Sequence, residues 1–205
     1  GAATVATGYG RHGVEGALTA VTEITCHARG ILAVLPDTRL LIDIGGQDSK
    51  AILIAADGRV ADFAMNDKCA AGTGRFLEAM ARGLEVDVDR LGSLAAIATT
   101  DITLSSICTV FAESEVVSLI ADGSAAADIA RGLHRAVAAR TLGLVRRVAP
   151  SLDGLPVAMS GGVARNEGVV RALEEALGVR VSVPADPDTI GALGAALIAR
   201  DRCRS

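Results

Sequence analysis

Short apolar runs alternate along this chain with longer segments in which apolar residues recur every three or four positions. The short runs predict β-strands at residues 3–7, 39–44, 50–56, 60–64, 155–159 and 180–183. Asp57 and Gly58 separate two of these runs, and this dipeptide is a strong signal for a hairpin. Residues 39–64 therefore predict three consecutive strands in a meander.

The segments with helical spacing lie between these strands. Residues 21–35 predict a helix that Pro36 ends, and residues 124–148 predict the longest one. Three more helices are marked by apolar triplets: Phe76, Met80 and Leu84; Val169, Leu173 and Leu177, closed by Gly178; and Ile190, Leu193 and Leu197. Another helix is expected after Cys108, with Thr109 as its cap, and Thr73 is the expected cap of the helix at Phe76. Alternating strands and helices favour a layered α/β fold.

Composition narrows the class of protein. The 205 residues suit one domain or two small ones, and half of them are hydrophobic although only 2% are aromatic. The formal net charge of -4 and the scarcity of aromatic rings argue against a nucleic-acid-binding protein. Since no apolar run reaches bilayer length and no signal-peptide pattern is present, we expect no membrane association and a cytoplasmic location. Cysteines in that compartment are not expected to form structural disulfides.

The first candidate site follows the strand at residues 39–44. This strand carries Asp43 near its end, and Gly45, Gly46 and Gln47 come directly after it. Two glycines let the backbone approach a ligand, and their N–H groups can face phosphate oxygens. Asp43 could hold Mg²⁺ directly or through water, and Gln47 could orient a water toward the terminal phosphate. An ordinary glycine turn with Asp43 as a local hydrogen-bond acceptor explains the same residues equally well.

A second glycine pair, Gly161 and Gly162, ends another predicted strand and precedes a helix. Paired glycines at such a junction allow a flat ring or a phosphate to lie against the backbone. A simple strand-to-helix turn, with Asn166 as the helix cap, is the alternative. Two loops of this kind could face one nucleotide across a cleft.

Cys69 and Cys108 each lie just before a predicted helix. A helix N-terminus stabilises a thiolate, which is the form that binds iron–sulfur clusters and zinc. Two cysteines cannot complete a four-thiolate site in one chain, but two copies of the chain on a two-fold axis could. From spacing alone, two inert buried thiols remain the simpler interpretation. We predict no ligand role for Cys26 and Cys203 and assign no role to three histidines, His12, His27 and His134.

Together these segments resemble the BadF/BadG/BcrA/BcrD ATPase family, which includes activators of 2-hydroxyacyl-CoA dehydratases and ATP-binding subunits of benzoyl-CoA reductases. The matching stretches are spread over nearly the whole chain, at residues 43–50, 66–80, 105–121, 160–168 and 191–196. The strings Asn-Asp-Lys-Cys-Ala-Ala-Gly-Thr-Gly-Arg-Phe, from residue 66, and Cys-Thr-Val-Phe-Ala-Glu-Ser-Glu, from residue 108, are the most specific.

The resemblance implies a fold like that of actin, Hsp70 and sugar kinases, which is ribonuclease H-like, and a dimer with one 4Fe-4S cluster between its subunits. Cys69 and Cys108 are then the expected cluster ligands, Asp43 and Gln47 the catalytic residues, and ATP or ADP with Mg²⁺ the other cofactors. Gly45 and Gly46 are expected at the phosphates. The residues implied at the adenosine are Gly161, Gly162 and Val163.

The resemblance also implies a role in electron transfer. ATP hydrolysis would drive one low-potential electron from the cluster to a partner dehydratase or reductase, with reduced ferredoxin or flavodoxin as the donor. Members of the family begin with a glycine-rich hairpin, and this hairpin would precede Gly1. We therefore expect an N-terminal segment to be missing from this sequence and ATP hydrolysis to depend on that segment. The expected division is 1–37 as the rest of a first subdomain, 38–185 as the second and 186–205 as a returning helix.

Three alternatives stay open. A sugar- or acetate-type kinase of the same fold would lack the cluster, a nucleotide-sensing subunit would bind without turnover, and a zinc-bound structural protein is the third. These motifs do not distinguish a dehydratase activator from a reductase subunit, or a homodimer from a heterodimer.

Overall fold

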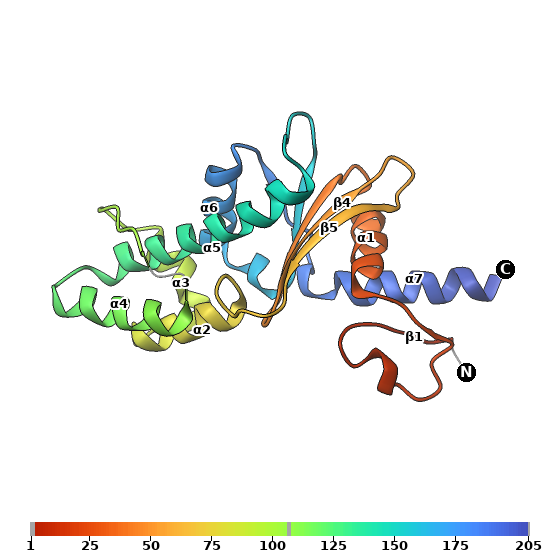
Figure 1. Ribbon diagram of the computed structural model, residues 1–205, viewed down its shortest axis with the longest axis horizontal. Helices are drawn as coiled ribbons and strands as arrows, with labels where there is room; N and C mark the ends of the chain where they lie inside the picture. The colour runs from red at the N-terminus through yellow and green to blue at the C-terminus, as the bar shows by residue number, and fades with distance from the viewer. Residues whose placement is uncertain (1–2, 106–107, 205) are drawn as a thin grey trace.

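The computed structural model describes residues 3–105 and 108–204 and is built around one five-stranded sheet (Figure 1). The strand order is β5-β4-β3-β6-β7. The strands are β3 (Leu40–Ile44), β4 (Ser49–Ile54), β5 (Val60–Asn66), β6 (Val157–Ser160) and β7 (Val181–Ser182). β3, β4 and β5 pair antiparallel, which confirms the predicted meander, whereas β6 pairs parallel with both β3 and β7. Parallel neighbours require long crossover connections, and helices provide them here.

Helices cover both faces of this sheet (Figure 1). One side carries α1 (Glu23–Val34) and α7 (Ile190–Arg204), which pack against each other. The other side carries α2 (Gly74–Gly83), α3 (Leu91–Ala95), α4 (Thr109–Ala121), α5 (Ala126–Val148) and α6 (Glu167–Leu177). The short 3-10 helices are η1 (Arg11–Gly13), η2 (Val88–Arg90), η3 (Gly162–Arg165) and η4 (Pro187–Thr189), and a separate parallel pair joins β1 (Val5–Ala6) to β2 (Thr19–Ala20).

The central strand β3 is buried along its whole length, and its side chains alternate between two cores. Leu40, Ile42 and Ile44 belong to the larger core, which α2 to α6 complete. Leu41 belongs to the smaller core beneath α1. Full burial of one such side chain stabilises the fold by about 1.5–3 kcal/mol. The same alternation directs Asp43 toward the α1 side of the sheet.

α1 and α7 lie unusually close together because glycines form their contact. A Cβ at Gly194 would overlap the carbonyl oxygen of Cys26 on α1. This close approach accounts for the glycines of the 191–196 motif. Whether these two helices form a subdomain separate from residues 38–185 stays a prediction.

The structure departs from the expected elements in five respects. The first predicted strand shortens to β1, and β2 and α3 were not expected from the pattern. Thr109 is not a cap: Cys108 occupies the N-cap position of α4, since the helix begins one residue earlier than the hydroxyl suggested. Thr73 does occupy the N-cap position of α2, but its hydroxyl donates to the carbonyl of Ala70 instead of accepting from the helix.

Ser106 and Ile107, which belong to the predicted Cys108 motif, lie outside the described residues. Within the residues that are described, no helix has the length and apolar character needed to cross a bilayer.

Candidate nucleotide site and cysteine segments

The two glycine pairs lie side by side although more than a hundred residues separate them along the chain. β3 and β6 pair parallel, with Asp43 opposite Ser160, so the loops that follow both strands leave the same edge of the sheet. Together they line a cavity of about 430 Å³, a size typical of small-molecule sites. The lining residues are Gly45, Gly46, Gly74, Leu77, Glu78, Val88, Asp89, Gly162, Val163, Arg165 and Asn166.

Gly161 has a different position from its neighbour. It does not line the cavity but lies beneath it, where its φ of 86° and ψ of 164° are accessible mainly to glycine. A Cβ at this residue would overlap the carbonyl of Ile44 at the end of β3. Gly161 therefore allows the two loops to touch, while Gly162 lines the cavity.

Asp43 lies at the centre of a buried polar cluster between the sheet and α1. Its carboxylate accepts from the Ser160 hydroxyl at 2.8 Å and from the Lys50 ammonium at 3.2 Å. Nδ1 of His27 lies 3.1 Å from Oδ1 of Asp43, an ion-pair distance without hydrogen-bond alignment. Burial alone would raise the pKa of the Asp43 carboxyl, but His27 and Lys50 outweigh it and lower that pKa to about 2.

Lys50 connects this cluster to residues nearer the N-terminus. Its ammonium contacts Asp48 at 2.8 Å and Glu23 at 3.5 Å, in addition to Asp43. Burial lowers the pKa of Lys50, but the surrounding carboxylates outweigh this and raise it, so the side chain stays charged. The Tyr9 hydroxyl donates to Asp48 at 3.1 Å and ties the 8–16 loop to the cluster.

Sequence reasoning missed His27, Lys50 and Glu23. Lys50 could have been found, because it lies directly opposite Asp43 in the β3–β4 register and so shares its face of the sheet. His27 and Glu23 are four residues apart on α1 and thus lie on one helix face. Only the docking of α1 brings them to Asp43.

The two residues expected to be catalytic are placed differently. Asp43 does not line the cavity, and both of its oxygens have protein partners. Gln47 is exposed and adjoins Gly46 at the cavity wall. The two residues therefore differ: Asp43 is buried behind the cavity wall with protein partners, whereas Gln47 is exposed beside the cavity.

The segment around Cys69 is joined directly to the first glycine loop. The Gly74 N–H donates to the carbonyl of Gly45, and the Arg75 N–H donates to that of Gly46, both at 2.9 Å. The Asn66 amide holds the carbonyl of Cys69 at 2.9 Å. These hydrogen bonds connect the first glycine loop to the start of α2, which directly follows the segment that carries Cys69.

The four cysteines are all unpaired, and they differ in exposure. Cys69 is half-buried and lies five residues before α2, farther from the helix N-terminus than expected. Cys108 is exposed at the N-cap of α4, which packs on α2. Cys26 is fully buried and Cys203 is exposed on α7. Among the residues described, no group of three or more histidine, cysteine or acidic side chains could hold a metal.

Asn166 links the cavity to the long helix α5. Its side-chain oxygen caps α6 by accepting from the N–H groups of Gly168 and Val169, which confirms the predicted cap. Its amide nitrogen lies 3.3 Å from Nε2 of His134, which is buried on α5. Burial, with a smaller contribution from Arg171, lowers the pKa of His134 to about 4. The ring is therefore neutral near pH 7.

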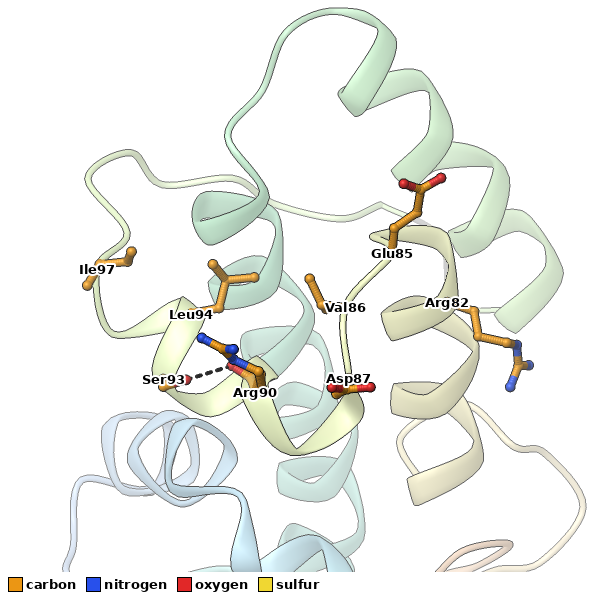
Figure 2. A pocket seen from close by; sticks show the side chains of 8 residues that line it. All are labelled: Arg82, Glu85, Val86, Asp87, Arg90, Ser93, Leu94 and Ile97. Atoms are coloured by element: carbon orange, nitrogen blue, oxygen red, sulfur yellow. Dashed lines mark hydrogen bonds between the residues drawn. The ribbon is translucent and has the colours of Figure 1, made fainter.

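A larger cavity, of about 700 Å³, lies beyond the C-terminal end of α2 (Figure 2). Acidic and basic side chains both line it, and Figure 2 shows Arg82 and Glu85 directed away from Arg90. Ser93 donates to the carbonyl of Arg90 within it. No residue expected from the sequence to bind a ligand lines this cavity.

Comparison with protein families and relatives places these features in context. The model of the BadF/BadG/BcrA/BcrD ATPase family matches residues 1–199. The 2-hydroxyisocaproyl-CoA dehydratase activator of Clostridioides difficile is 48% identical over 200 residues, which cover 98% of this chain and 74% of that relative. The (R)-2-hydroxyglutaryl-CoA dehydratase activating ATPase of Acidaminococcus fermentans is 51% identical, with 96% and 74% covered. A benzoyl-CoA reductase subunit of Thauera aromatica is 37% identical, with 85% and 63% covered.

Solved structures agree with the sequence matches. The structure of the Clostridium difficile activator with bound ADPNP superposes with a TM-score of 0.92 and covers 98% of this chain and 74% of its own. The ethanolamine utilization protein EutJ of Carboxydothermus hydrogenoformans, at 18% identity, shares the fold with a TM-score of 0.54 over 87% of this chain and 55% of its own. The predicted α/β fold of the actin and Hsp70 kind is thereby confirmed.

Proposed function

Since this chain belongs to the BadF/BadG/BcrA/BcrD ATPase family, we propose that it binds and hydrolyses ATP between its two glycine loops and couples this to electron transfer. Two copies, or one copy and a homologous subunit, hold one 4Fe-4S cluster on Cys69 and Cys108. The electron goes to a 2-hydroxyacyl-CoA dehydratase or a benzoyl-CoA reductase, and reduced ferredoxin or flavodoxin supplies it. The names of the relatives support this class of partner.

The cysteines fit half of such a cluster. Neither is fully buried, and each precedes a helix that begins near it, α2 for Cys69 and α4 for Cys108. The described part of one chain lacks a complete set of metal ligands, so a site shared across a two-fold axis suits this donor set. A 4Fe-4S cluster bound by four such thiolates supplies one-electron chemistry at a potential that the surrounding protein tunes.

The nucleotide is expected in the cavity between the loops. Backbone at Gly45, Gly46 and Gly162 leaves room for a ligand to approach, and Val163 offers an apolar contact to the base. The Clostridium difficile activator, which is 48% identical, was solved with bound ADPNP, and this supports a nucleotide as the ligand. Because both oxygens of Asp43 have protein partners, we assign Asp43 to Mg²⁺ through water, and Gln47 to positioning the attacking water.

The observation that carries the coupling is the pair of backbone hydrogen bonds from Gly74 and Arg75 to Gly45 and Gly46. When ATP binding shifts the glycine loop, these bonds move the start of α2 and the preceding Cys69 segment with it. ATP and ADP contact the loop differently, so they stabilise different positions of this segment. The nucleotide thus controls the environment of Cys69 without touching it.

Two variants of Gly74 test this coupling. Proline at the first helical position keeps the helix but removes the N–H that Gly45 accepts, and Thr73 already has the extended φ of -118° that precedes proline readily. Gly74→Ala keeps the N–H and introduces the same Cβ, which would lie 3.2 Å from Cα of Gly46, so it is the matched control for crowding of the glycine loop. The assay follows cluster oxidation after the reduced protein is mixed with an acyl-CoA dehydratase, with and without ATP.

We expect oxidation to require ATP in the wild type and in Gly74→Ala. In Gly74→Pro, ATP should bind as it does to Gly74→Ala but should no longer accelerate oxidation. ATP stimulation of equal size in both variants would contradict the coupling route. A wild type whose cluster is oxidised at the same rate without ATP would contradict the proposed function itself.

A further inference from the structure

Arg140 reaches from the long helix α5 to the thiol of Cys69. Its Nη2 lies 3.8 Å from the Cys69 Sγ, within the range of a hydrogen bond to sulfur. The stem of the side chain passes over Gly72, whose φ is +85°. A Cβ at Gly72 would lie 3.3 Å from Cδ of Arg140, closer than ordinary van der Waals contact. Because Gly72 has no side chain, the arginine can pass over it to approach the sulfur.

The helix that carries Arg140 is firmly placed. The neighbouring residues Val137, Ala138 and Thr141 are buried on α5, and Arg140 is half-buried beside them. Arg140 thus extends from a packed helix, α5, to the loop that contains Cys69 and Gly72. Because Arg140 is half-buried on a packed helix, its side chain is more restricted than that of an arginine fully exposed to solvent.

We infer that Arg140 is a positioning residue for Cys69, and that it raises the reduction potential of the cluster. This inference rests on the proposed function. A guanidinium donor orients the sulfur along its N–H direction and places positive charge next to the site. Reduction adds an electron, so nearby positive charge and hydrogen bonds to the ligand sulfur stabilise the reduced form. A symmetric dimer would apply the effect twice.

The same helix connects Arg140 to the nucleotide cavity. His134 lies six residues earlier on α5, about 9 Å along the helix axis, and contacts Asn166 at the cavity wall. Arg140 therefore belongs to a structural element that meets the nucleotide site at one point and Cys69 at another. In the proposed motion, the Cys69 segment moves relative to α5, and Arg140 on α5 contacts the Cys69 sulfur.

The test compares two variants of Arg140 with a control on the same helix. Arg140→Met keeps an unbranched side chain but removes the donor and the charge, and Arg140→Lys keeps the charge without the planar fork. Arg147→Met removes an exposed arginine from α5, seven residues farther along. Each variant is loaded with a cluster under anaerobic conditions, its iron content is measured, and its midpoint potential is determined by a spectroscopic redox titration.

We expect the potential of Arg140→Met to be more negative than that of the wild type, with Arg140→Lys between them and Arg147→Met unchanged. Loss of iron from a folded Arg140→Met, together with a lowered potential in Arg140→Lys, would also support the positioning role. Equal iron and equal potentials in the wild type and both Arg140 variants would overturn the inference alone. A wild type that takes up no cluster would overturn the proposed function and the inference with it.

Discussion

The contact between the two glycine loops depends on Gly161, so replacing this residue with alanine should destabilise the fold. A side chain at its φ of 86° and ψ of 164° is strained wherever it occurs, at a cost of about 1–3 kcal/mol. The new Cβ would also overlap the carbonyl of Ile44, which belongs to the central strand and cannot rotate away. Overpacking of this kind costs about another 1–3 kcal/mol.

The expected loss of about 2–6 kcal/mol is a large part of the total stability of a typical domain, about 5–15 kcal/mol. The neighbouring Gly162 provides a matched control. A Cβ at Gly162 would meet no atom within 4 Å, so Gly162→Ala should change the free energy of unfolding by less than about 0.5 kcal/mol. Because that Cβ would enter the cavity, Gly162→Ala should instead weaken nucleotide binding.

Urea denaturation followed by far-UV circular dichroism measures the first effect, because a chain with no Trp and one Tyr offers little intrinsic fluorescence. Titration with a non-hydrolysable ATP analogue measures the second. If Gly161→Ala unfolds at the same urea concentration as the wild type, the loop contact does not have the geometry described. If Gly162→Ala proves as unstable as Gly161→Ala, the two glycines do not have separate roles.

Two other predictions follow from the buried polar residues. The pKa of His134 is lowered from 6.5 to about 4, so between these pH values only the unfolded chain binds a proton at this residue. The free energy of unfolding should therefore fall by about 3 kcal/mol as the pH falls from 6.5 to 4. His134→Gln should flatten this dependence in urea denaturations at several pH values, and an unchanged slope would refute the assignment. Asp43→Asn should slow ATP hydrolysis by about 10–100-fold, the usual effect of losing an outer-shell partner of a metal, without loss of iron. Full turnover in that variant would remove Asp43 from the site.

Local patterns in the sequence were sufficient to predict the strands of the five-stranded sheet and both glycine loops. The apolar run at residues 39–44 predicts a buried strand, and each glycine pair predicts a sharp turn after its strand. These signals are local because propensity and side-chain period act over a few residues. The cap formed by Asn166 was predictable for the same reason.

The polar cluster around Asp43 was not predictable to the same extent. His27 reaches Asp43 only because α1 docks on the sheet. The close packing of α1 with α7 in turn joins the two ends of the chain. The contact between Arg140 and Cys69 likewise joins residues 71 positions apart. Tertiary packing determines such contacts, and no spacing within a single segment encodes them. Thr109 failed as a cap because the residue before it, Cys108, already has the extended backbone that a cap requires.

Native mass spectrometry of the anaerobically purified protein and its cysteine variants is the decisive test of the shared cluster. We expect an assembly of two subunits that carries four iron and four sulfide ions, and loss of these ions in Cys69→Ser and in Cys108→Ser. Cys203→Ser, which changes another exposed cysteine, should keep them. A wild type without iron, or full iron in either of the first two variants, would contradict the claim that paired chains pool these thiolates around one cluster.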